Sequence, residues 1–145
     1  MRLRGFDYKI TYYIHNSNTM ETNNQYIPGV CNIGPDEIAH RNKVAWIGLS
    51  FTIILWALFI TLNVPALWRL TLFIPAIMSA TGFLQAYMKF CVYFGFANLF
   101  NFGTVGTTDT VSQAEYRAKD RKKAWQITLS AILIGIVVAY LGYTL

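Results

Sequence analysis

Three long stretches with almost no charge restrict the fold of this chain more than any other feature. Residues 44–62 and 124–145 contain no Asp, Glu, Lys or Arg, and residues 66–88 contain only Arg69. A helix over residues 44–62 spans about 28 Å, close to the thickness of the hydrocarbon core of a bilayer. The composition, 54% hydrophobic and 13% charged, suits a bilayer better than a small soluble core. We therefore expect an all-α integral membrane protein with three transmembrane helices.

Residues outside these spans predict helical extensions on the cytoplasmic side. The sequence GPDE at residues 34–37 predicts a helix start. Proline would take the first helical position, and the two acids after it would lie near the positive end of the helix dipole. Ser112 and Glu115 have the spacing of a capping box, which predicts a second helix start. Pro75 predicts a kink in the second span. Residues 90–102 are aromatic and too short to cross, so they are expected to lie in the headgroup plane or to pack under the bundle.

The N-terminal segment differs in composition from the spans. Residues 16–26 are rich in Asn, Ser and Thr, which is typical of loop or disorder. Met20 is a second candidate start, so residues 1–19 are a candidate mis-assigned start. We expect a flexible segment over residues 1–30 and a three-helix domain over residues 31–145.

Positive charge gathers on one side of the predicted spans. Of the 12 lysines and arginines, only Arg69 lies beside the turn between the first and second spans, which leaves 11 for the other side. Cytoplasmic loops carry such an excess. We therefore expect a multi-pass membrane protein with its N-terminus inside and its C-terminus outside. Five of these residues form a basic collar expected to contact lipid headgroups rather than nucleic acid. They are Arg117, Lys119, Arg121, Lys122 and Lys123.

Small residues recur at intervals of four on all three spans, with Gly48 and Thr52 on the first. The others are Ala131, Gly135 and Ala139 on the third span, and Gly82 and Ala86 on the second. Such rows let helix backbones approach closely in lipid. The face can serve association with a second copy or a partner, or packing inside one three-helix bundle. In the first case, Gly135→Leu is expected to disrupt assembly.

The two cysteines define the one candidate chemical site. Cys31 precedes the first helix and Cys91 follows the second, so a tight turn between these helices brings both to the cytoplasmic edge of the membrane. Glu37 and His40 are three residues apart on the first helix and share a face near them. Two thiols there would be suited to redox sensing or sulfur handling. The alternatives are a soft metal site and simple packing of small buried side chains.

The stretch from Cys31 to Gly103 resembles a known bacterial arrangement. It is similar to the two-helix transmembrane domain found alone or fused to membrane-anchored rhodanese sulfurtransferases. The matching positions are Asn32, Ile33, Gly34, Arg41, Thr81, Gly82, Phe90, Cys91, Tyr93 and Gly95. Val92 stands where that family often has proline, and no rhodanese domain is present, so the resemblance implies no sulfurtransferase activity. The chain also resembles small bacterial membrane proteins with a CNIGP motif before the first helix. The resemblance implies a helical hairpin in a bacterial inner membrane and favours sulfur handling.

Sequence patterns typical of catalysis or transport are absent. The chain has no Gly-rich phosphate loop and no HExxH motif, and its spans have no Asp, Glu or Lys in their interiors. We therefore expect a small non-enzymatic membrane subunit or scaffold that packs with itself or with a larger complex. Its expected partners are the lipid bilayer and other transmembrane helices, and no cofactor or metal is expected. The alternative is the thiol site at Cys31 and Cys91.

Overall fold

A computed structural model gives the fold, and it describes residues 25–145. The expectations for residues 1–19 lie outside the described residues. Within the described range, three helical runs are long and apolar enough to cross a membrane, which agrees with the three predicted spans in length and composition. The runs are α2 (Pro35–Thr61), the series α3 (Ala66–Arg69), η1 (Leu70–Leu72) and α4 (Phe73–Tyr87), and α6 (Ala114–Thr144).

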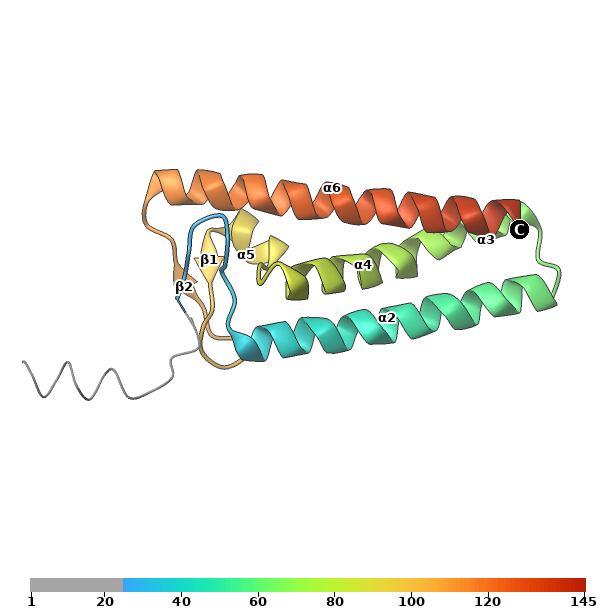
Figure 1. Ribbon diagram of the computed structural model, residues 1–145, viewed down its shortest axis with the longest axis horizontal. Helices are drawn as coiled ribbons and strands as arrows, with labels where there is room; N and C mark the ends of the chain where they lie inside the picture. The colour runs from blue at the N-terminus through green and yellow to red at the C-terminus, as the bar shows by residue number, and fades with distance from the viewer. Residues whose placement is uncertain (1–24) are drawn as a thin grey trace, which may run out of the picture.

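The three runs form a layer with α4 in the middle (Figure 1). Helix α2 packs against one side of α4 and α6 packs against the other, whereas α2 and α6 barely meet. Helix α2 therefore buries only Glu37, Ala45 and Thr52 within the chain. The C-terminus lies at the same end as the turn between α2 and α3 (Figure 1).

Small residues set the distance between α2 and α4. A Cβ added at Gly82 would lie 2.8 Å from the Cβ of Ala45, and one added at Gly48 would lie 3.2 Å from the Cβ of Ser79. The Ser79 hydroxyl donates a hydrogen bond of 2.9 Å to the carbonyl of Ala45. The backbones of α2 and α4 can approach this closely because these positions carry little or no side chain.

The second run is irregular ahead of Pro75. Residues Leu70–Leu72 form a 3-10 turn before α4 begins at Phe73. Proline has no N–H, and its ring clashes with the carbonyl four residues earlier, here that of Thr71. The distortion predicted from Pro75 therefore takes the form of a tightened turn.

The segments outside the spans fold into a cap at the N-terminal ends of α2 and α6 (Figure 1). The cap consists of residues 26–34 and 88–113. It contains α5 (Val92–Ala97) and an antiparallel pair of short strands, β1 (Leu99–Phe100) and β2 (Asp109–Thr110). The sequence predicted only helices, so this two-stranded sheet is a correction. Strands of two residues are too short to show a periodic pattern.

Residues 90–102 pack under the bundle, the second of the two expected placements. Helix α5 lies against α6, and Phe90, Cys91 and Phe94 are buried. Gly95 permits this contact, because a Cβ there would lie 2.7 Å from the Phe90 ring and 3.0 Å from the Cβ of Ala124.

The two predicted helix starts have different outcomes. Helix α2 begins at Pro35, as the sequence predicts. Helix α6 begins at Ala114 with Gln113 as its N-cap and no capping side-chain hydrogen bond, so the predicted capping box is wrong. Because the helix starts one residue later than the box requires, Glu115 instead pairs with Lys119 at 2.7 Å.

The ordered cap extends N-terminal to Cys31. The Tyr26 hydroxyl and the backbone N–H of Gly29 each donate a hydrogen bond of 2.7 Å to the carboxylate of Asp120. Asp120 is fully buried at the base of α6. The predicted boundary of the flexible segment at residue 30 is therefore too late, because this buried carboxylate holds residues 26–29 against α6.

Candidate functional site

Asn32 is the centre of a buried hydrogen-bond network in the cap. Its Nδ2 donates to the Cys91 carbonyl at 3.1 Å, and the Cys91 N–H donates to its Oδ1 at 2.6 Å. Its backbone N–H donates to the Lys89 carbonyl, and its carbonyl accepts from the Asn101 N–H. Asn32 thus ties the segment before α2 to the loop after α4 and to the residue that follows β1.

Glu37 continues this network and is 3% exposed. Its Oε1 accepts hydrogen bonds from Asn101 Nδ2 at 3.2 Å and from the Gly106 N–H at 3.4 Å. Its Oε2 pairs with Arg41 Nη2 at 3.3 Å. The carboxylate is therefore satisfied inside the cap, as a buried charge must be.

His40 does not join Glu37 in a site. Glu37 turns inward to Asn101, whereas His40 is exposed. Residues three apart on a helix lie near each other, but here the cap covers only the edge that carries Glu37. Across residues 25–145, no group of three His, Cys, Asp or Glu side chains is placed to hold a metal ion.

Both candidate cysteines lie in the cap and are buried free thiols. The Cys31 Sγ–H donates a weak hydrogen bond of 3.6 Å to the Ile33 carbonyl, and Cys91 packs with Ile33 and Phe94. Burial raises the pKa of both thiols above the ordinary value. Since the thiolate is the reactive form, these environments favour packing over thiol chemistry.

The predicted small-residue face is largely covered within the chain. Ala131, Gly135, Ala139 and Gly82 are buried, and Ala86 is half-buried. A Cβ at Gly135 would lie 3.0 Å from the ring of Phe73 in the same chain. Packing inside one bundle therefore accounts for this face, and Gly135→Leu would disturb the fold before any assembly.

The basic collar lies on the first turns of α6, beside the cap. Lys119, Arg121 and Lys122 are exposed, whereas Arg117 and Lys123 are half-buried. The Lys119 Nζ pairs with Glu115 and lies 5.9 Å from the centroid of the Tyr116 ring. Exposed cations beside a span are placed to meet anionic headgroups.

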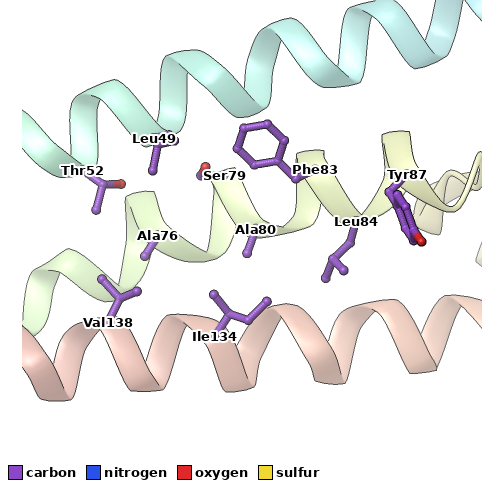
Figure 2. Close-up of a pocket in the computed structure, with 10 residues that line it drawn as sticks. All are labelled: Leu49, Thr52, Ala76, Ser79, Ala80, Phe83, Leu84, Tyr87, Ile134 and Val138. Atoms are coloured by element: carbon purple, nitrogen blue, oxygen red, sulfur yellow. The ribbon is translucent and has the colours of Figure 1, made fainter.

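A second candidate site is an apolar groove across α4, the α4 groove, which Figure 2 shows. Its volume is about 330 Å³, and a neighbouring hollow of about 230 Å³ shares Leu49, Thr52 and Val138 with it. The full lining is Leu49 and Thr52 of α2, Ala76, Ser79, Ala80, Phe83, Leu84 and Tyr87 of α4, and Ile134 and Val138 of α6. The groove exists because α2 and α6 stand apart on either side of α4.

Few polar atoms face the α4 groove. The Thr52 hydroxyl donates to the Gly48 carbonyl at 2.8 Å, and Ser79 donates to Ala45. Both hydroxyls are therefore satisfied by helix carbonyls. The groove can hold an apolar chain or helix.

Sequence reasoning missed Asn101 and Asp120. Asn101 is the polar side chain that ends the aromatic run at residues 90–101, and Asp120 is the acid within the basic stretch at residues 117–123. A polar residue in an apolar run, or an acid in a basic one, was the available signal. It indicates a side chain with a specific buried partner.

Comparisons with protein-family models, with curated proteins and with solved structures found no match to this chain. Its class therefore rests on its own architecture. It is a helical protein with three candidate membrane spans and, at one end, a hydrogen-bonded cap.

Proposed function

We propose that this chain is a small non-enzymatic membrane subunit or scaffold that packs against a transmembrane helix of a second copy or of a larger complex. The α4 groove carries the proposal. Its floor contains Ala76, Ser79 and Ala80, the small residues over which membrane helices approach closely. Helix α2 also leaves most of its surface uncovered within the chain. An incoming helix would contact α2, α4 and α6 together.

We also propose a bacterial inner membrane location with the cap in the cytoplasm and the C-terminus outside. The support is the distribution of positive charge, because the basic collar and Lys89 adjoin the cap and Arg69 lies near the far end. A reporter that is active only outside the cytoplasm should be active when fused after Leu145. The same reporter inserted at the exposed Val105 should be silent. The reverse pattern would overturn the orientation.

Filling the α4 groove should weaken association. Val138 lines both parts of the groove and is half-buried. In Val138→Phe, the larger ring would occupy the space that the incoming helix needs. We expect association to weaken by about tenfold, the size of a moderate overpacking penalty. Native mass spectrometry of protein gently extracted from its own membranes measures the assembled fraction.

The neighbouring residue provides the matched control for this substitution. Val137 lies at nearly the same depth on α6 but is 50% exposed and lines neither part of the groove. Val137→Phe should leave assembly unchanged. Equal assembly of both variants and the unsubstituted chain would contradict the use of the groove as an interface.

The second candidate function is sulfur handling or redox sensing at the cytoplasmic edge. It is supported by the placement of Cys31 and Cys91 in one cap, where Asn32, next to Cys31, bonds both backbone groups of Cys91. The same mass spectrum distinguishes the two functions. A lone chain that carries added sulfur would favour the thiol site, and a stable assembly of unmodified chains would favour the subunit.

A further inference from the structure

A second pocket, the edge pocket, lies between α2 and α4 close to the cap. It has a volume of about 330 Å³. Arg41, Thr81 and Gln85 contribute polar atoms, and Val44, Ile77 and Met78 contribute apolar surface. At 3.6 residues per turn, the α4 residues of this pocket face away from Ala76, Ser79 and Ala80 of the α4 groove. The two sites therefore occupy opposite faces of the helical layer.

Donors without acceptors line the polar end of this pocket. Gln85 is 6% exposed, and its Oε1 accepts a hydrogen bond of 3.2 Å from the Val92 N–H. Its Nε2 makes no hydrogen bond within residues 25–145 and keeps contact with solvent at the pocket wall. An amide N–H at the wall of a pocket can donate to a ligand that accepts hydrogen bonds.

Arg41 adds a positive charge to the same end. Only its Nη2 is engaged, by Glu37 at 3.3 Å, and its buried Nε has no partner in the described part of the chain. A guanidinium offers five N–H donors in a planar fork that matches the oxygens of a phosphate. Glu37 is meanwhile occupied by Asn101 and Gly106 on its other oxygen.

The two ends of the pocket lie at different depths. Arg41 precedes Val44, where the uncharged stretch of α2 begins, so it lies at headgroup level in the proposed orientation. From Gln85 to Ile77, α4 advances by about 12 Å, which carries the pocket from headgroups into the acyl region. A free phosphate would leave the apolar end unused. A phospholipid matches both ends.

We propose that the edge pocket binds one anionic glycerophospholipid of the cytoplasmic leaflet. Its phosphate accepts hydrogen bonds from Arg41 and Gln85, and its first acyl segment lies against Val44, Ile77 and Met78. The site depends on the chain spanning a membrane, but not on an occupant of the α4 groove. Failure of Val138→Phe to alter assembly would therefore leave this proposal standing.

The test is native mass spectrometry of the intact chain with phosphatidylglycerol or phosphatidylcholine added to the detergent. The chain should retain phosphatidylglycerol with about tenfold higher affinity, because its net charge suits the guanidinium. Arg41→Gln should abolish this preference. Lys43→Gln removes the same charge two residues away, at an exposed position, and should preserve it.

A second pair of variants tests the apolar end without changing charge. Met78 is 59% exposed and lines the pocket. Ile74 lies one turn before it in α4, is 60% exposed and does not line the pocket. Met78→Trp should reduce phosphatidylglycerol retention by about fivefold or more through overpacking, and Ile74→Trp should not. This pair keeps the test decisive if Arg41→Gln fails to fold.

Three outcomes would overturn the proposal. They are equal retention of the two lipids by the unsubstituted chain, equal loss in Lys43→Gln and Arg41→Gln, and unchanged retention in Met78→Trp. Competition with inorganic phosphate distinguishes a phospholipid ligand from a free phosphate. Inorganic phosphate should fail to displace phosphatidylglycerol, and complete displacement would assign the site to a free phosphate instead.

Discussion

Gly82→Leu should separate α2 from α4 and cause one of the two largest losses of stability in this chain. A Cβ at this position already lies 2.8 Å from the Cβ of Ala45 and 3.1 Å from the carbonyl oxygen of Arg41. Neither the helix backbone nor a methyl group can move aside as a flexible side chain does. We expect a loss of about 3 kcal/mol or more in the free energy of unfolding. Thermal unfolding followed by tryptophan fluorescence in detergent should show Tm falling by about 10 °C.

The contact with Ala45 allows a specific control. Gly82→Ala should destabilise less than Gly82→Leu, and adding Ala45→Gly should restore part of the loss, because it removes one of the two methyl groups that collide. Ala57→Leu places the same side chain at an exposed position of α2 and should leave Tm nearly unchanged. If Gly82→Leu unfolds at the same temperature as Ala57→Leu, the close approach at Gly82 is wrong.

Asn32→Ala should cause a comparable loss by disconnecting the cap. The substitution leaves the N–H of the buried Cys91 without an acceptor, whereas the Cys91 carbonyl loses the Asn32 amide but keeps the hydrogen bond from the Gly95 N–H. An unsatisfied buried group costs about 1–3 kcal/mol and a lost hydrogen bond about 1 kcal/mol, so we expect a loss of about 2–4 kcal/mol in the free energy of unfolding. The same thermal unfolding measurement quantifies it.

Hydrogen exchange should locate the effect of Asn32→Ala in the cap. Amides of residues 88–101 should exchange faster, while those in the middle of α4 keep their protection. Asn42→Ala removes the same side chain at an exposed position of α2 and should change stability by less than about 0.5 kcal/mol. Unchanged exchange at Cys91 in Asn32→Ala would contradict the network.

Much of the helical architecture is determined by the sequence alone. Residues 124–145 carry no charge and are long enough to cross a bilayer. In lipid, the backbone N–H and C=O groups of such a stretch find hydrogen-bond partners only in a helix or in a closed barrel. Pro35 marks the start of α2 because proline is favoured at the first helical position and no residue before it continues the helix. Both features depend only on residues that are close in the sequence, so the sequence pattern is enough to predict them.

The cap was decided by tertiary structure. Asn32, Asn101 and Asp120 acquire their roles from partners 59 to 94 residues away in the sequence, such as Cys91 for Asn32 and Tyr26 for Asp120. No periodicity encodes such pairs. The same holds for Glu37, whose partner is Asn101 of the cap rather than the cysteines that sequence reasoning placed beside it.

The sequence determined that this chain has three apolar helices long enough to cross a membrane, because length and lack of charge alone decide whether a segment can do so. Tertiary structure decided which faces these helices use. The row of Ala131, Gly135 and Ala139 looked available for a partner and is largely taken up within the chain. The α4 groove and the edge pocket instead arise because α2 and α6 both pack on α4 and leave its two other faces open. Side-chain spacing along one helix cannot specify which neighbour covers it.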